Sequence, residues 1–300
     1  MNINEMISKN MEYRNHMIRK AKPIVDLDVI NAIKNIEYVN INSDLPISAN
    51  QFEFLDTHLK WISSSKNYKI TGLDKFTPLV TSGVTDAFND FYFLNKKISV
   101  MRGEYTYHRD LGYEVLDNIH TIEPYSSLII SYPFSATGNV HPDWEKIMEV
   151  CDDKKIKVFV DCCLFGVSKV EELDLSLECI THVAFSFSKI FSTAGNRTGV
   201  LYTRYNETTP LQKQSEHFYT NMMGQIMHLH LMNNFEPDYI FNKYRSKQEK
   251  LCKEYDLDIS DTVMFGTSTS SKFDYFERDK YINRICLAYS LQEFSIPLEF

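Results

Sequence analysis

Residues 183–204 read VAFSFSKIFSTAGNRTGVLYTR, and this stretch decides the fold class of the chain. It begins and ends with apolar runs rich in β-branched and aromatic residues, which are typical of buried strands. Between the two runs lie Lys189, a set of small polar residues and Arg197. A lysine that directly follows a buried strand either turns into solvent or is held for chemistry. The end of this strand is therefore the first candidate for a functional site.

Short apolar runs alternate with amphipathic segments on both sides of this stretch. SLIISYPF (127–134) precedes HPDWEKIMEVCDDKK (141–155), and IKVFVD (156–161) and GVLYTR (199–204) follow as further apolar runs. Strand, helix and strand in repetition predict an α/β fold, with a mostly parallel sheet covered by helices on both faces.

The flanking regions differ from this pattern. Residues 1–66 predict an N-terminal helical segment, because VINAIKNI and NQFEFLDTHLKWISSS carry apolar residues at helical spacing. Residues 67–205 form the predicted large domain. Residues 206–300 predict a helical connection followed by a small terminal domain, in which TVMFGTSTSSKFDYF and INRICLAYSL are interpreted as strands.

Composition excludes several classes of function. The chain has 300 residues and a formal net charge of −8, so it has no general electrostatic attraction to nucleic acid or to an anionic membrane surface. The polar N-terminus and the lack of a long apolar run predict a cytoplasmic protein. The six cysteines show no metal or disulfide spacing and are interpreted as reduced thiols. His228 and His230 would face one side of a strand, but no further ligand lies near them in the sequence, so no metal site is predicted.

Four polar positions follow predicted strands, at the sheet edge where ligands bind in such folds. Gly83 opens a helix whose first turn holds Thr85, which favours either an anion site or an ordinary tight turn with a helix cap. Asp161 ends an apolar strand, where a buried carboxylate needs a cationic or protonated partner. Lys189 ends the next strand, and Arg197 lies eight residues further on.

Together these positions resemble the aspartate aminotransferase superfamily, the fold-type I enzymes that use pyridoxal 5′-phosphate (PLP). The resemblance rests on TSGVTDA, on YPFSATGNVHPDWEKIMEVCDDKKIKVFVD, and above all on SFSKIFSTAGNRTG, with its Ser-x-Ser-Lys and Gly-x-Arg-x-Gly segments. It implies a seven-stranded type of sheet and a reduced α+β terminal domain. It also implies a homodimer with PLP as cofactor.

The resemblance assigns roles to individual residues. Lys189 would form the Schiff base with PLP and later move the substrate α-proton, and Asp161 would keep the pyridine nitrogen protonated. The phosphate would be held by the Gly83 turn and by an arginine suited to bidentate contacts. The implied cofactor-binding residues beyond Lys189 and Asp161 are Gly83, Val84, Thr85, Ser135, Ser186, Ser188 and Arg197.

Three further assignments have competing interpretations. Tyr107 is expected to stack on the cofactor ring, with Tyr105 as the alternative. Tyr68 is expected to reach the phosphate of a neighbouring subunit or to be a core aromatic. Arg284 is expected to bind the substrate α-carboxylate or to be an ordinary surface arginine.

The chain departs from the family pattern at two places. FSATG has Ser135 and Ala136 where the family has an asparagine before Pro-Thr-Gly, and Leu164 replaces a tyrosine three residues past the aspartate. In the family, this asparagine and this tyrosine both contact the hydroxyl group of the PLP ring.

The resulting hypothesis is a PLP-dependent aminotransferase-like enzyme acting on an α-amino acid, with a 2-oxo acid as the second substrate if the reaction is transamination. PLP-dependent lyase, decarboxylase, racemase or cyclase chemistry remains open, as does a catalytically silent PLP-binding homologue. A nucleotide-binding α/β protein is disfavoured, because the chain has neither a P-loop nor a Gly-x-Gly-x-x-Gly segment.

Overall fold

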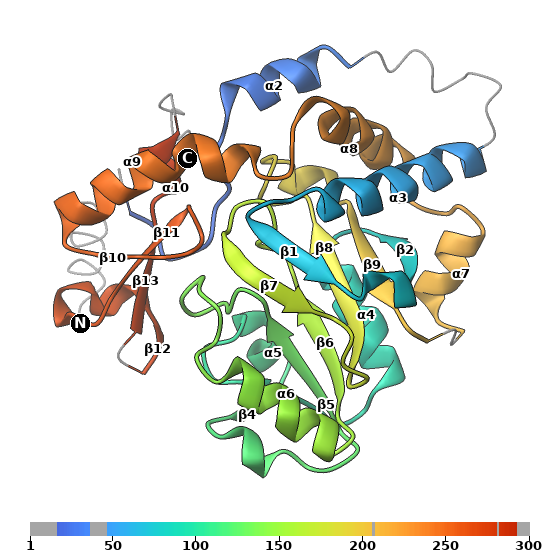
Figure 1. Cartoon of the computed structure of the whole chain (residues 1–300), viewed down its shortest axis with the longest axis horizontal. Coiled ribbons are helices and arrows are strands. Elements are labelled where there is room, and N and C mark those ends of the chain that lie inside the picture. Colours follow the sequence, from blue (N-terminus) through green and yellow to red (C-terminus); the bar gives the residue numbers. More distant parts are fainter. Residues whose placement is uncertain (1–16, 37–46, 206–207, 281, 293–300) are drawn as a thin grey trace.

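A computed structural model describes residues 17–36, 47–205, 208–280 and 282–292 of the chain. Its centre is a seven-stranded sheet in the order β2-β9-β8-β6-β5-β3-β4 (Figure 1). Six of these strands run in the same direction, and β9 is antiparallel to both of its neighbours. The sheet strands are β2 (Thr77–Thr81), β3 (Ile98–Met101), β4 (Glu114–Leu116), β5 (Ser127–Ser131), β6 (Lys157–Asp161), β8 (Ile180–Ser186) and β9 (Gly199–Thr203).

Helices surround this sheet. They are α2 (Leu27–Lys34), α3 (Ile47–Ser63), α4 (Val84–Leu94), α5 (Thr106–Asp110), α6 (Trp144–Asp153), α7 (Pro210–Glu216), α8 (Met222–Asn234), α9 (Tyr239–Tyr255) and α10 (Ala288–Leu291). Of the helices described, the three longest are α3, α8 and α9. Short 3₁₀ turns occur at η2 (Leu73–Lys75), η3 (Ile119–Thr121), η4 (Ala194–Asn196) and η5 (Ser271–Phe276).

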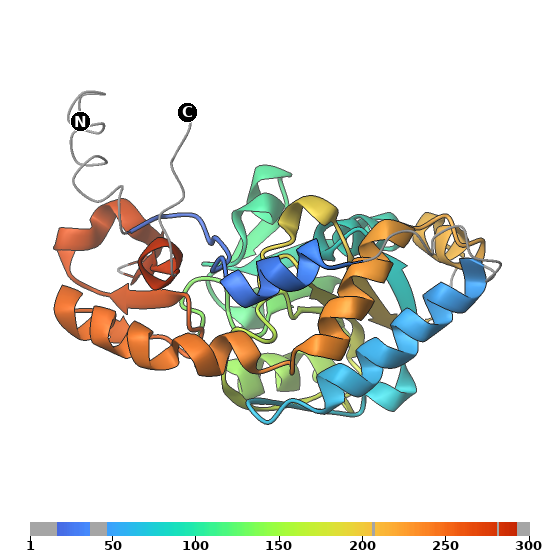
Figure 2. The same cartoon turned by 90° about the horizontal axis from the view of Figure 1, so that it is seen from above.

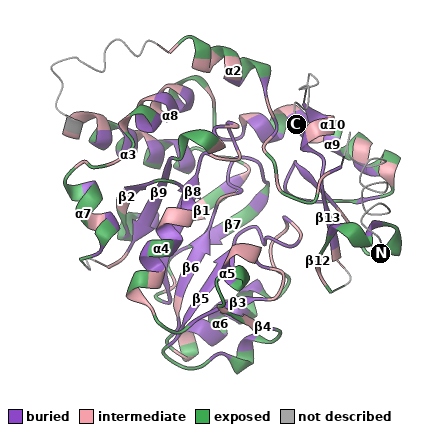
Figure 3. Ribbon diagram, turned by 180° about the vertical axis from the view of Figure 1, so that it is seen from behind, coloured by how far each residue is buried: buried purple, intermediate pink, exposed green. Residues whose placement is uncertain are grey.

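The central strands are apolar throughout because both faces of the sheet are covered. Successive side chains of a strand point to opposite faces. Accordingly Val158 and Val160 pack into one hydrophobic cluster, while Phe159 between them packs into the other. Helix α4 contacts β2, β8 and β9 and supplies Phe88 and Phe91 to the second cluster. Figure 3 shows the strands buried and the outer helix faces exposed.

A smaller four-stranded antiparallel sheet, β10-β11-β13-β12, packs with α9 and α10 at one side of the molecule (Figure 1). Its strands are β10 (Asp258–Ile259), β11 (Phe265–Ser268), β12 (Glu277–Asp279) and β13 (Ile282–Cys286). The predicted α/β fold with a reduced α+β terminal part is confirmed. The interpretation of both terminal segments as strands was only partly right, because each strand is followed by a helical turn, η5 and α10 respectively.

The sequence did not reveal a second parallel sheet, which pairs β1 (Tyr68–Thr71) with β7 (Val170–Asp174). These strands are four and five residues long and about a hundred residues apart, so neither carries a distinct local signal. The largest hydrophobic cluster includes Ile24, Phe54, Val160, Phe241 and Ile285, and so runs through all three predicted segments. The boundaries at residues 66 and 205 stay predictions. Among the described residues, no helix is long and apolar enough to cross a membrane.

Three buried histidines make folding sensitive to acid. His58, His182 and His228 are almost fully buried, and burial lowers the pKa of each to about 3. Below a pH of about 6.5 the unfolded chain therefore binds protons that the folded chain excludes. The free energy of unfolding should fall by about 1.4 kcal/mol per pH unit for each of them between pH 6.5 and pH 4.

Denaturant unfolding at several pH values checks this expectation. His58 packs among five aromatic rings, with its Nδ1 2.9 Å from the Tyr202 hydroxyl. Replacing His58 with phenylalanine should reduce the number of protons taken up on unfolding below pH 6.5 by about one, which lowers the dependence of the free energy of unfolding on pH. An unchanged slope in His58→Phe would contradict the assignment, and His120→Phe, on an exposed turn, is the matched control.

Candidate active site

The predicted site residues gather at one edge of the large sheet, because parallel strands present their carboxyl ends there. Asp161 ends β6, Ser186 ends β8, and Gly83 follows the end of β2. In the ladder Ser131 of β5 lies opposite Asp161, and Asp161 lies opposite Ala184 of β8. The structure therefore brings the main sequence candidates into one region.

Gly83 and Arg197 form an anion-type cradle at the start of α4. Gly83 has a φ of +90°, and a Cβ placed on it would lie 2.7 Å from the Arg197 Nη2 atom and 3.5 Å from Ser186 Oγ. The next residues, Val84 and Thr85, form the first helical turn, whose N–H groups have no partner within the helix. Only glycine leaves room here for an arginine to approach the helix N-terminus.

The serines of the Ser-x-Ser-Lys segment complete this cradle. Ser186 Oγ donates to Ser188 Oγ at 2.9 Å, and Arg197 Nη1 donates to Ser188 Oγ at 3.2 Å. Arg197 is exposed, and a second bond from Nη1 to the Ala194 carbonyl holds its guanidinium. Hydroxyl groups, helix N–H groups and a guanidinium in one place suit a phosphate group.

Asp161 is buried with few compensating contacts. Its side chain is only 4% exposed, and its Oδ1 atom accepts one hydrogen bond from the Cys163 N–H at 2.8 Å. Burial, followed by the nearby Glu104 carboxylate, raises the pKa of Asp161 to about 7, and the positive charge of Lys189 opposes this shift. A carboxylate in this state is suited to pair with a cationic group.

The stretch of residues 17–26, which passes from the four-stranded sheet to α2 (Figures 1 and 2), contacts Lys189 through Ala21. Its Nζ donates to the Ala21 carbonyl at 2.8 Å. Burial lowers the pKa of Lys189, and Arg284 lowers it further, while Cys163 and Cys286 act in the opposite direction. The lysine is held inside the molecule, as a role in chemistry requires.

Arg284 is buried, so the surface-arginine interpretation is wrong. Its side chain is 4% exposed, its Nη1 donates to the Ser135 carbonyl, and its guanidinium lies 4.4 Å from the centre of the Phe265 ring. Burial, together with the neighbouring Arg278, lowers the pKa of Arg284 to about 9. Within the described chain, its Nε has no hydrogen-bond partner. A buried guanidinium with an open donor is suited to bind a carboxylate.

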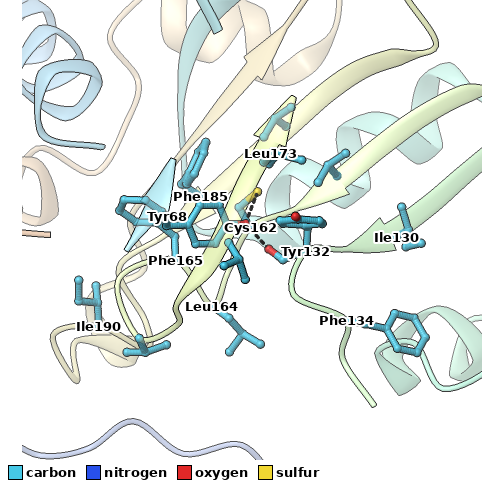
Figure 4. Close-up of a cluster of buried hydrophobic side chains, with 14 of the residues drawn as sticks. Tyr68, Ile130, Tyr132, Phe134, Cys162, Leu164, Phe165, Leu173, Phe185 and Ile190 are labelled. Carbon is cyan, nitrogen blue, oxygen red and sulfur yellow. Dashed lines mark hydrogen bonds between the residues drawn. The ribbon is translucent and has the colours of Figure 1, made fainter. Parts of the chain in front are cut away.

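The structure does not place Tyr68 in the site. Tyr68 is fully buried in its own chain, where its hydroxyl donates to the Tyr132 carbonyl and to Cys162 Sγ at 3.6 Å (Figure 4). Its ring packs edge-on against Phe165. Because the hydroxyl is already bonded inside the core, this conformation matches the alternative of a core aromatic. Leu164, which Figure 4 also shows in this cluster, is likewise buried.

Charges of the site act on Tyr105, the alternative to Tyr107 as the stacking residue. Burial raises the pKa of Tyr105, and Cys163 and Asp161 raise it further, while Arg197 opposes them. Tyr105 therefore stands within electrostatic range of three site residues. The hydroxyl of Tyr107 contacts Asn89 Oδ1 at 3.5 Å, and the two rings stack on each other at 5.9 Å.

Sequence reasoning missed Glu104, Cys163 and the Ala21 carbonyl. Glu104 had a detectable signal, since a glutamate directly after an apolar strand and a Gly103 turn is unusual at this edge. The Ala21 contact had none, because it joins positions 168 residues apart.

The suspected histidine pair is not a metal pair on a strand. His228 and His230 lie on α8, two residues apart, so they point to different sides of the helix. His228 is bonded to Thr193 Oγ1 and to the Gly224 carbonyl. Among the described residues no cluster of three metal-ligating side chains occurs, and all six cysteines are unpaired.

Comparisons with known proteins agree with this geometry. A family model for aminotransferases of class I and II matches residues 104–252, about half of the chain. No curated protein sequence matches significantly. Several solved structures share the fold.

An aspartate aminotransferase double mutant from Thermus thermophilus is 14% identical with a TM-score of 0.65, and the match covers 94% of this chain and 90% of that one. An aminotransferase from Mycobacterium tuberculosis is 16% identical with a TM-score of 0.63, covering 90% and 89%. A PLP-bound C–S lyase from Staphylococcus hominis is 13% identical with a TM-score of 0.63, covering 89% and 86%. Identities this low show the fold alone.

The chain has the fold of these aminotransferase structures. The match of residues 104–252 to the family model supports the class I and II aminotransferase superfamily.

Proposed function

We propose that the chain is a PLP-dependent aminotransferase-like enzyme that acts on an α-amino acid through Lys189. The observation that carries this proposal is the grouping of charged side chains around Lys189. The charge of Lys189 interacts with those of Asp161 and Arg284, and the segment that holds Lys189 also holds Ser186 and Arg197 of the cradle. An amine, a carboxylate, an anion cradle and a carboxylate-binding arginine thus meet at one sheet edge.

The residues present fit PLP. Gly83, whose missing Cβ lets Arg197 approach the start of α4, together with Arg197 and the two serines, suits the phosphate. The raised pKa of Asp161 suits a partner that carries a proton, such as a protonated pyridine nitrogen. Tyr107 or Tyr105 would stack on the ring, and the action of Asp161 and Arg197 on Tyr105 supports Tyr105 as a candidate for this role.

When bound, PLP supplies an aldehyde that condenses with amines and a ring that accepts an electron pair from the substrate carbon. Asp161 keeps a proton at the ring nitrogen, and the cradle fixes the phosphate. Arg284 orients the amino acid by its α-carboxylate. Lys189 would supply the amine that condenses with this aldehyde and would take the substrate α-proton at Nζ, and its lowered pKa favours the neutral amine that proton removal needs.

The reaction that follows proton removal separates transamination from lyase or related chemistry. The similarity in fold to a protein described as a C–S lyase supports keeping the second candidate. Incubation with PLP and a panel of amino acids distinguishes them, since transamination consumes an added 2-oxo acid in step with keto-acid release. Elimination releases the leaving group without such an acceptor.

Borohydride reduction tests the role of Lys189. Reduction of the PLP-loaded protein should fix the pyridoxyl group on the peptide that contains Lys189. A pyridoxyl group on another lysine, or on none, would overturn the proposal. Lys22 is the most informative competitor, because its charge acts on the site lysine.

Replacing Arg284 by alanine should raise KM for α-amino acids. A hydrogen bond to a charged group contributes about 1.5–3 kcal/mol, which corresponds to about a 10- to 150-fold increase in KM. Arg245→Ala, on α9 and paired with Glu249, is the control that should leave KM unchanged. Steady-state kinetics on variants of equal thermal stability decide the matter, and an unchanged KM in Arg284→Ala would show that another residue reads the carboxylate.

A homodimer and a cytoplasmic location belong to the same proposal and rest on the sequence resemblance and composition. Sedimentation equilibrium at working concentrations tests the first. Full activity from a monomer would show that the site is complete within one chain, which agrees with the burial of Tyr68.

A further inference from the structure

Glu104 is a buried acid whose bonds connect two parts of the proposed site. It is 6% exposed and lies just past the end of β3. Its Oε1 accepts hydrogen bonds from the Tyr105 N–H at 2.8 Å and from the Ser131 hydroxyl, and its Oε2 accepts from the Ser131 N–H at 2.7 Å. Burial raises the pKa of Glu104, whereas these three donated hydrogen bonds and the charge of Arg278 oppose the shift and favour the ionised carboxylate.

Both bonding partners of Glu104 adjoin the candidate cofactor site. Ser131 lies directly opposite Asp161 in the β5–β6 ladder, so the Glu104 carboxylate stands next to the strand end that carries Asp161. Tyr105 is the candidate stacking residue. The loop has little freedom to move, since a Cβ on Gly103 would lie 2.9 Å from Ala136 Cβ and 3.1 Å from Asp279 Oδ2.

A positive charge faces Glu104 from the small sheet. Arg278 on β12 acts on Glu104 and is partly buried, with an Nε that lacks a hydrogen-bond partner within the described chain. Arg278 therefore offsets the negative charge of Glu104 without being bonded to it. The other titratable groups that interact with Glu104 or Asp161 include Tyr68, Tyr92, Tyr105, Cys162, Cys163, Lys189 and Arg284.

We propose that Glu104 is a positioning residue that fixes the backbone of Tyr105 and keeps a second negative charge beside Asp161, so that the cofactor's ring nitrogen stays protonated. This inference rests on the proposed function. A carboxylate behind Asp161 makes the site more negative, and that favours the proton shared between Asp161 and the ring. Arg278 has the opposite effect.

The probe for this role is pyridoxine 5′-phosphate, which has the ring nitrogen and the phosphate but no aldehyde to react with Lys189. At saturation, ultraviolet difference absorbance follows loss of the ring proton as pH rises. Glu104→Gln should lower the midpoint by about one pH unit, because it removes a nearby negative charge. Arg278→Gln should raise the midpoint, and Glu104→Asp should keep it near the wild-type value.

Glu114→Gln is the matched control. Glu114 also accepts a bond from a strand serine, Ser99 Oγ at 2.7 Å, but it has no contact with the site. A purely structural role for Glu104 would lower thermal stability and leave the midpoint unchanged, and that result would overturn the inference alone. If Glu104→Gln does not fold, Arg278→Gln decides: a midpoint that does not rise would also overturn it. Failure of the wild-type protein to bind pyridoxine 5′-phosphate would overturn the proposed function as well.

Discussion

Replacing Lys189 by alanine should reduce turnover of α-amino acids by at least about 10⁴-fold, because one side chain both links the cofactor and moves the α-proton. The Lys189 Nζ is held by the Ala21 carbonyl, three residues past the end of β8, and Lys22 is the nearby lysine that could compete with it. Binding of PLP should persist without a covalent bond, because Arg197, Ser186 and the Gly83 turn remain.

The measurement combines turnover assays with PLP titration of the same preparation. Lys250→Ala, at an exposed position of α9, is the control and should keep wild-type turnover. Retained turnover in Lys189→Ala would contradict the assignment of the lysine. Loss of PLP binding together with turnover would show instead that the cradle alone does not hold the phosphate.

Replacing Asp161 by asparagine should have the second-largest effect, a loss of about 10²- to 10³-fold in turnover. The asparagine oxygen can still accept the 2.8 Å bond from the Cys163 N–H, so the local backbone should stay in place. What is lost is the negative charge that keeps a proton at the ring nitrogen. Rate measurements at saturating PLP separate this loss from weaker cofactor binding.

The same substitution should stabilise the cofactor-free protein at alkaline pH. Because the pKa of Asp161 is raised to about 7 in the folded state, the folded protein binds a proton more tightly than the unfolded chain. The protonation of Asp161 therefore stabilises the folded protein at low pH, and this stabilisation is lost as pH rises from about 4 to 7. Asp161→Asn removes this loss, so its melting temperature relative to wild type should be higher at pH 8 than at pH 4.

Asp90→Asn is the control for both measurements. Asp90 is another buried aspartate with a raised pKa, but it lies on α4 and contacts the Leu211 N–H rather than the site. It should keep turnover while showing a similar dependence of stability on pH. Equal losses of turnover in the two variants would mean that Asp161 acts through general stability.

The sequence alone predicted a mostly parallel sheet covered by helices, several of its strands, and candidate residues at its carboxyl edge. Buried strands need continuous apolar runs, and covering helices need amphipathic ones, so both are readable locally. Asp161, Lys189 and Gly83 were readable because parallel strands end at the same edge, whatever the details of packing. Arg197 followed from its spacing to Lys189 within one loop.

Only the tertiary structure decided which side chains reach that edge and which are buried elsewhere. Tyr68 turns into the core because β1 pairs with β7, a partner about a hundred residues away. Glu104 became a site residue only through Ser131, and the Ala21 carbonyl only through a contact across 168 residues. Such contacts depend on how distant elements pack, and a local pattern of residue types carries no record of that packing.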